Sequence, residues 1–156
     1  MAKYPEVILE LIRAGRQRPW FSSSDYIEPI QRYFKDLTRE ESNKFRADLV
    51  GMLERPTYLV ELTEICVALD IRESCARILA IAKKPPQRLQ VDGRAIPADH
   101  IQEFCIAALG HLKYVEALTW LRGLIEKRLS TAAAKPQIVR ALEFSGLLIS
   151  MASMDL

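Results

Sequence analysis

The sequence has few side chains of the kinds that usually carry catalysis, since its 156 residues include two histidines and three cysteines. The HExxH, GxGxxG, GxxxxGKS/T and GxSxG motifs are all absent, so the common zinc-protease, dinucleotide, P-loop and nucleophile-elbow signatures are excluded. An odd number of cysteines without CxxC spacing argues against a disulfide framework or a zinc site. We therefore expect Cys66, Cys75 and Cys105 to be small buried apolar residues in a reducing compartment.

A strong net charge and a long apolar run are also missing. Lys and Arg total 22 against 20 Asp and Glu, so the net charge of +2 gives little attraction toward nucleic acid or an anionic membrane. The longest apolar tract, Phe144 to Met151, is far shorter than the ~20 residues that span a bilayer. The N-terminus has acids within its apolar run and resembles no secretory signal. We expect a soluble cytoplasmic protein with no membrane partner.

The few candidate catalytic or metal-binding residues lack the partners that such sites need. His100 and Glu103 are spaced to share a helix face, but three or four converging ligands hold a metal and no second such pair exists. His111 follows Gly110 and has no orienting partner at a recognisable spacing, so a turn between two helices explains it better than a general base. We expect no cofactor, no metal and no enzymatic activity, while an enzyme that uses these residues stays a third hypothesis.

What the sequence does contain is helical periodicity. The length suits one domain over residues 1–156, and 49% apolar with 27% charged residues indicates a globular chain. Apolar stripes separated by Gly, Pro and capping residues predict about eight helices. These are expected from Pro5 to Gly15, from Asp25, from Arg39, from after Thr57 to Leu69, from Asp70, from Pro97, from after His111, and from Pro136.

Some helix starts have a clear chemical basis. Thr38 and Glu41 have the spacing of a capping box. Asp70 and Glu73 have the same spacing, with Asp in place of Ser or Thr, at the start of the fifth helix. Asp25 is expected to cap the second helix. The inward face of the sixth helix is predicted to hold Ile101, Phe104, Cys105 and Ala108.

The helical pattern is interrupted at residues 86–96. Leu89 and Val91 alternate with polar residues, and Asp92-Gly93 favours a two-residue type I′ turn. This stretch predicts a short β-hairpin or an ordered loop inserted into an otherwise all-α fold.

Two segments of the chain resemble one another. Superimposing "ICVALDIRESCARILAIA" on "FCIAALGHLKYVEALTWL" aligns Cys66 with Cys105, an offset of 105 − 66 = 39 residues. The stretch "AALGHLKYVEALTWLRGLI" resembles a HEAT repeat, with an apolar first helix that ends at Leu-Gly, a tight turn, and an acid-Ala-Leu run that opens the second helix. The resemblance covers roughly residues 57–128 and implies stacked antiparallel helical hairpins near the ~40 to 47-residue HEAT period. A compact helical bundle is the alternative architecture.

Three groups of residues are candidates for partner binding. Arg18, Trp20 and Phe21 combine a cation with π-faces, as sites for phosphates and unstacked bases do, although the aromatics could simply anchor a linker onto the second helix. A second basic concentration surrounds the hairpin, including Arg88 and Arg94. Trp120 lies at the edge of the apolar arc of the seventh helix, where it either packs on a neighbour or anchors a partner.

These features together favour a non-enzymatic protein that binds another protein. Stacked helical hairpins form extended surfaces that can vary without disturbing the core. By size and class the chain is similar to bacterial toxin-neutralising immunity proteins and to adaptors. A homodimer that forms through the apolar C-terminal segment "LEFSGLLISMASM" also fits these features. The alternative function is nucleic-acid binding, in the manner of the HEAT-like proteins that grip the DNA backbone with basic residues.

Overall fold

The computed structural model describes residues 3–55, 57–91, 94–132 and residue 154. The described chain is almost entirely helical, which confirms the all-α class. Its α-helices are α1 (Lys3–Arg16), α2 (Ser24–Lys35), α3 (Arg39–Met52), α4 (Leu59–Ala68), α5 (Cys75–Lys83), α6 (Ala98–His111) and α7 (Leu118–Ala132), with 3₁₀ helices η1 (Arg72–Ser74) and η2 (Val115–Ala117) before α5 and α7. The eighth helix expected from Pro136 lies outside the described residues.

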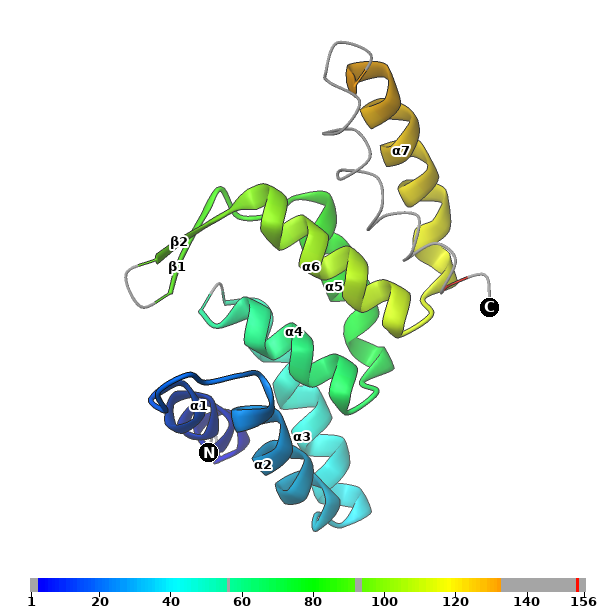
Figure 1. Cartoon of the computed structure of the whole chain (residues 1–156). Coiled ribbons are helices and arrows are strands. Elements are labelled where there is room, and N and C mark those ends of the chain that lie inside the picture. The colour runs from blue at the N-terminus through cyan, green and yellow to red at the C-terminus, as the bar shows by residue number, and fades with distance from the viewer. Residues whose placement is uncertain (1–2, 56, 92–93, 133–153, 155–156) are drawn as a thin grey trace.

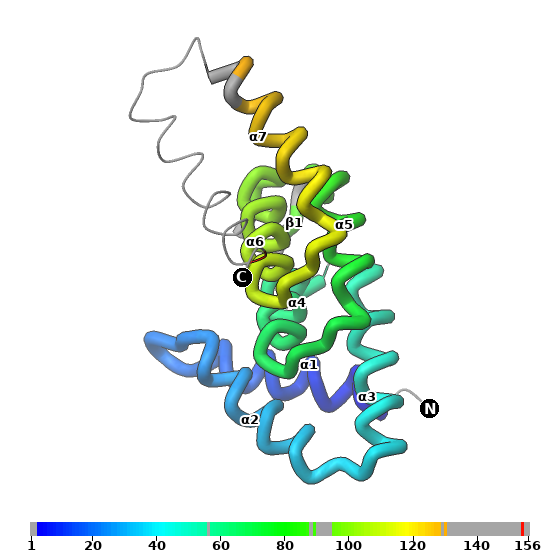
Figure 2. The backbone as a smooth tube through the Cα atoms, turned by 90° about the vertical axis from the view of Figure 1, so that its right-hand side faces the viewer, coloured from blue at the N-terminus to red at the C-terminus, as the bar shows by residue number. Residues whose placement is uncertain are grey.

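Helices α2 to α6 form two layers, which α1 crosses at one end (Figure 1). In one layer, α4 lies between α2 and α6 and contacts both (Figure 1). In the other layer, α3 contacts η1 and α4, and α5 packs along α6 (Figure 2). Helix α1 packs against α2 and α3. Among the described residues, no further helix covers the outer face of the α2–α4–α6 layer.

An aromatic cluster joins α1, α2 and α3. The ring of Phe45 is fully buried, and its centroid lies 5.6 Å from that of Tyr4 and 5.3 Å from that of Phe34. The ring centroid of Tyr33 lies 6.2 Å from that of Phe45. Aromatic pairs at these separations contribute beyond the apolar area that they bury. Helix α3 begins with the predicted capping box, because the Glu41 N–H donates to Oγ1 of Thr38 and the Thr38 N–H donates to the Glu41 carboxylate.

Gly15 permits an unusually close approach of α1 to α2. A Cβ at this position would lie 2.8 Å from the carbonyl oxygen of Asp25. Pro29, inside α2, has no N–H, so it cannot donate the helical hydrogen bond that the Asp25 carbonyl would otherwise accept. The expectation that Gly15 ends the first helix is wrong by one residue, since α1 continues to Arg16. Gly15 instead lets α1 pack closely against the backbone of α2 at the Asp25 carbonyl.

Two turns, after α4 and after α6, repeat one another in detail. Asp70 and Lys113 both have left-handed backbones, with φ of 53° and 54°. After α4 the Ile71 N–H donates to the Cys66 carbonyl, and after α6 the Tyr114 N–H donates to the Leu109 carbonyl. Together with bonds from Asp70 to Val67 and from Lys113 to Gly110, these are Schellman motifs.

The repeat therefore has an offset of 113 − 70 = 43 residues rather than the 39 obtained by aligning cysteines. The alignment on Cys66 and Cys105 is wrong because it matches side-chain identity, whereas the turns fix the backbone register. The Gly110-His111 pair is not the turn either, since both residues belong to α6 and the left-handed position is Lys113. At the new offset the buried positions coincide: Leu62 with Cys105, Cys66 with Leu109, Ser74 with Ala117, and Ile78 with Leu121.

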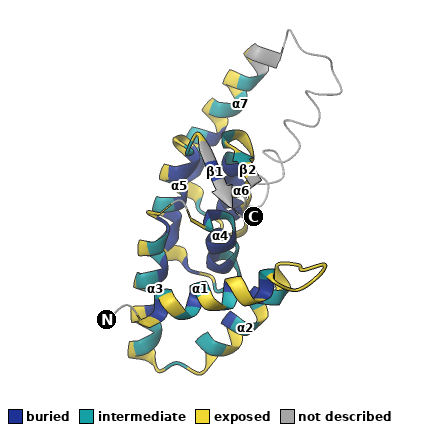
Figure 3. Ribbon diagram, turned by 90° about the vertical axis from the view of Figure 1, so that its left-hand side faces the viewer, coloured by how far each residue is buried: buried dark blue, intermediate teal, exposed yellow. Residues whose placement is uncertain are grey.

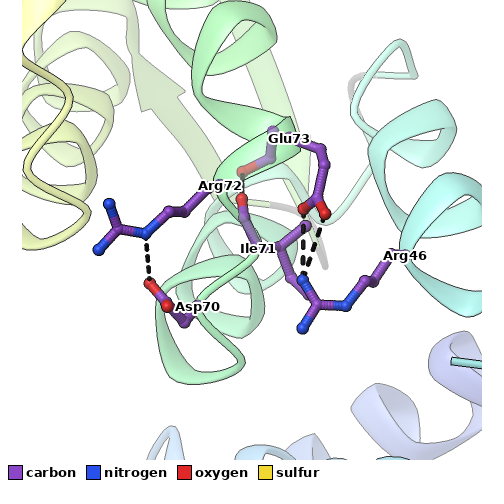
Figure 4. A network of polar contacts seen from close by, with 6 residues as sticks. Arg46, Asp70, Ile71, Arg72 and Glu73 are labelled. Atoms are coloured by element: carbon purple, nitrogen blue, oxygen red, sulfur yellow. Dashed lines mark hydrogen bonds and ion pairs between the residues drawn. The ribbon is translucent and has the colours of Figure 1, made fainter. Parts of the chain in front are cut away.

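The turn before α5 docks on α3 through charged side chains rather than through a cap. Nη1 of Arg46 donates to both carboxylate oxygens of Glu73, at 3.3 and 3.4 Å, while Asp70 Oδ1 lies 3.4 Å from Nε of Arg72 (Figure 4). Oγ of Ser74 donates to the Ile71 carbonyl at 2.6 Å. The prediction that Asp70 and Glu73 form a capping pair is therefore wrong. A left-handed Asp70 ends α4, and η1 intervenes before α5 begins.

The predicted hairpin is present as two short antiparallel strands, β1 (Arg88–Val91) and β2 (Arg94–Pro97). Leu89 pairs with Ile96 and Val91 pairs with Arg94, while the turn predicted at Asp92-Gly93 lies outside the described residues. Leu89 is buried, and β2 leads directly into α6.

Candidate functional site

An apolar groove lies on the α2–α4–α6 layer, and we name it the α4 groove. Its volume is about 320 Å³. Most of its lining is apolar or small, and it comes from the start of α2, the outer face of α4 and the second half of α6: Ser23, Ile27, Val60, Thr63, Glu64, Val67, Ala68, Phe104, Ala107, Ala108 and His111. A concave apolar surface with a few polar groups is the usual form of a binding site.

Phe104 is the groove residue whose position differs most from expectation. The sequence pattern predicts it to face inward, but the side chain is 45% exposed. Ile101, Cys105 and Ala108 are buried as expected, and they complete the inward stripe of α6 without Phe104. A large exposed aromatic residue beside an apolar groove is typical of an interaction surface.

One wall of the α4 groove carries a fixed carboxylate. The hydroxyl of Tyr26, a buried residue of α2, donates a hydrogen bond to the Glu64 carboxylate on α4. Burial raises the pKa of the Tyr26 phenol far above its ordinary value, and the hydrogen bond to Glu64 raises it further. The phenol therefore stays a donor, and it orients a negatively charged acceptor whose remaining lone pairs are available at the groove.

The loop between α1 and α2 projects from the same side of the molecule as the α4 groove. In Figure 2 the loop extends beyond α2 toward the left of the view; α6 lies to the left of α5, on that same side. Figure 3 shows the loop as an exposed segment. At its tip Trp20 is 100% exposed and has a left-handed backbone with φ of 59°, a conformation that is rare for a bulky residue and is often associated with functional loops.

Polar contacts fix the two ends of this loop. Asp25 does not cap α2 as expected; its carboxylate instead accepts from the Ser22 N–H at 2.8 Å and lies 3.4 Å from Nη1 of Arg18. Hydroxyls of Ser22 and Ser24 lie 2.6 Å apart. Because these contacts tie Arg18 and Ser22, on either side of Trp20, to the first turn of α2, they position the segment that carries the exposed indole.

A buried ion pair joins the base of the loop to α4. Nη1 of Arg16 donates to Oε1 of Glu61 at 2.6 Å, and the side chains are only 14% and 11% exposed. The Arg16 guanidinium also lies over the Phe21 ring at 5.7 Å and the Tyr58 ring at 5.5 Å. Phe21 thus contacts the last residue of α1, while remaining 46% exposed.

The structure separates the predicted site residues into different regions. Arg18, Trp20 and Phe21 share the α1–α2 loop. The backbone pairing places Arg88 opposite Pro97 and Arg94 opposite Val91, at opposite ends of the hairpin. Trp120 is half-buried and packs against the core from α7, and it does not line the α4 groove.

The candidate catalytic side chains are either exposed on α6 or buried as thiols. His100, Glu103 and His111 are all exposed on α6, and no cluster of three metal-ligating side chains occurs within residues 3–55, 57–91 and 94–132. The three cysteines are buried free thiols. Burial raises the pKa of Cys66 and of Cys105 to about 12, and that of Cys75 to about 11, which disfavours the nucleophilic thiolate.

Comparisons with protein-family profiles, curated proteins and solved structures found no match to this chain. Among the helices that the structure describes, none combines the length and apolar character needed to cross a membrane.

Proposed function

We propose that the protein is a non-enzymatic protein–protein interaction module, and that the α4 groove accepts an apolar side chain of a protein partner. The observation that carries the proposal is the combination, on one side of the molecule, of an apolar groove with two large exposed aromatic residues, Phe104 beside it and Trp20 on the adjacent loop. Aromatic residues at such surfaces often dominate binding free energy.

The repeated turns support a HEAT-like stacked-hairpin architecture as the scaffold of this module. Their 43-residue spacing, from Asp70 to Lys113, falls within the range of that family. Within this proposal a cytoplasmic immunity protein or adaptor is the class that the chain's size and helical surface fit best.

Nucleic-acid binding is supported less well by the contacts around the α1–α2 loop. Arg16, at the base of the loop, is mostly shielded from water and already has a carboxylate partner in Glu61. Binding to a nucleic-acid backbone gains free energy when Lys and Arg side chains displace the counterions condensed on its phosphates. An arginine that already pairs with a carboxylate contributes less to this gain.

The test is affinity purification of the tagged full chain from cells that produce it naturally, with three versions compared by quantitative mass spectrometry. Ala107 lines the groove and is exposed, so Ala107→Arg should block it. Ala80 is exposed on α5, and Ala80→Arg is the matched control. Loss of a stoichiometric protein partner in the first variant alone is expected, whereas equal recovery in all three would contradict the proposal.

A further inference from the structure

We propose that the partner in the α4 groove is a second copy of this chain, with Trp20 of each copy inserted into the groove of the other. This inference rests on the proposed function and names its partner. The primary observation is that the indole of Trp20 is fully exposed, so it does not fill the groove of its own chain. A fully exposed tryptophan leaves its large apolar surface in water, which burial against a partner removes.

The positions of loop and groove suit a two-fold arrangement. In an isologous dimer, a residue i of one copy contacts j of the other, and j contacts i in return. Both features must therefore lie on one face. The groove begins at Ser23, three residues after Trp20, and the loop projects from the groove side of the molecule (Figure 2).

The chemistry of the groove suits an indole. Val67, Ala107 and Phe104 supply apolar contacts along its length, and Phe104 can pack against the indole ring as an aromatic pair. The indole N–H is a donor only and needs an acceptor when buried. Glu64 supplies one on the groove wall, since the single Tyr26 bond leaves its carboxylate with further capacity.

Charge also complements the pairing. Arg18 lies two residues before Trp20, and its side chain is 70% exposed despite the contact with Asp25. In the reciprocal dimer this guanidinium comes with the indole toward the Glu64 carboxylate of the other copy. Opposite charges at the rim favour encounter and fix orientation more than they add affinity.

Sedimentation equilibrium over about a hundredfold range of protein concentration tests the inference. Wild-type protein is expected to approach twice the 17.8 kDa chain mass. Trp20→Ala removes the inserted side chain, and Ala107→Arg blocks the groove. Each should lower the dimer association constant by about thirtyfold or more, as loss of a central anchor does. Val115→Ala, at a 53% exposed apolar residue outside the groove, should leave it unchanged.

A mixture of the two variants gives a signature that other interfaces do not. A Trp20→Ala homodimer has no inserted indole and an Ala107→Arg homodimer has no open groove, but the mixed dimer retains one complete contact. The mixture should therefore dimerise more strongly than either variant alone. Circular dichroism of each variant verifies that the fold is retained.

Two outcomes would overturn the inference: a wild-type protein that stays monomeric, or a dimer that both variants leave intact. A monomer whose binding to single-stranded DNA is lost in Trp20→Ala would overturn it in favour of nucleic-acid recognition. A monomer that still captures a different protein through the groove would overturn it while leaving the proposed function standing.

Discussion

Nη1 of Arg16 lies 2.6 Å from Oε1 of Glu61, and this buried ion pair ties the end of α1 to the first turn of α4. Both side chains are mostly shielded from water. Removing one member of a buried pair leaves the other charge in a poorly solvated place, which typically costs about 3–5 kcal/mol. The pair thus fixes the base of the loop that carries Trp20.

Replacement of Arg16 tests this directly. We expect Arg16→Met to lower the free energy of unfolding by about 3 kcal/mol, because the mostly buried Glu61 carboxylate then loses its contact with the guanidinium. The same substitution at exposed Arg18 breaks only the 3.4 Å contact with Asp25 and should cost about 0.5 kcal/mol. Urea denaturation measures both. Equal losses would show that burial of the Arg16–Glu61 pair has no energetic consequence.

Gly15 provides a second contrast. Gly15→Ala would place a Cβ 2.8 Å from the Asp25 carbonyl oxygen, so α1 and α2 must separate, at an expected cost of about 2–3 kcal/mol. Gly123 in α7 has open space around it, and Gly123→Ala should stabilise the protein by about 0.5–1 kcal/mol through helix propensity. Thermal unfolding of the pair should show shifts of opposite sign, and a stabilised Gly15→Ala would refute the close contact.

Lys113 should be improved by the residue that its backbone conformation favours. Its φ of 54° is costly for a side chain bearing a Cβ, so Lys113→Gly is expected to raise the free energy of unfolding by about 0.5–1 kcal/mol. Lys44 is exposed within α3, and Lys44→Gly should instead cost about 1 kcal/mol. Chemical denaturation compares them; destabilisation by both would contradict the left-handed turn.

The buried thiols predict a loss of stability in alkali. Burial raises the pKa of Cys66 from its ordinary value of 9.0 to about 12, so the unfolded chain ionises first as the pH rises. The stability that the buried thiol contributes is fully present below pH 9 and is lost between pH 9 and 12. Over that range the free energy of unfolding falls by at most about 1.4 kcal/mol per pH unit for each such thiol. Urea denaturation at several pH values from 8 to 10.5 gives the free energy of unfolding as a function of pH. This free energy should fall less steeply with pH for Cys66→Ala than for wild type. Identical slopes would mean that this thiol ionises equally in both states.

Local chemistry explains which elements could be predicted from sequence. The Thr38–Glu41 capping box and the Asp92-Gly93 hairpin depend on residues within a few positions of each other, and both the cap and the flanking strands are present. The turn at Lys113 could not be predicted in this way, since lysine has no preference for a left-handed backbone. Packing on both sides of the turn, together with its Schellman hydrogen bonds, accounts for that conformation.

The α4 groove could not be predicted because no single segment of the chain forms it. Its lining comes from three helices that are far apart in the sequence, and only their packing shows that Phe104 lies outside the core. The exposed Trp20 was identifiable as a candidate from its neighbours Arg18 and Phe21. The contacts that tie the residues around it to Arg16 and Asp25 are not encoded by the sequence pattern.

Site-specific photo-crosslinking detects directly whether the α4 groove binds protein. A benzophenone amino acid in place of Phe104, beside the groove, is irradiated in cells that produce the protein naturally, and the same amino acid in place of exposed Ala80 on α5 serves as the control. We expect a discrete protein adduct from position 104, abolished by Ala107→Arg, and none from position 80. No adduct from position 104, or equal adducts from both positions, would contradict this expectation.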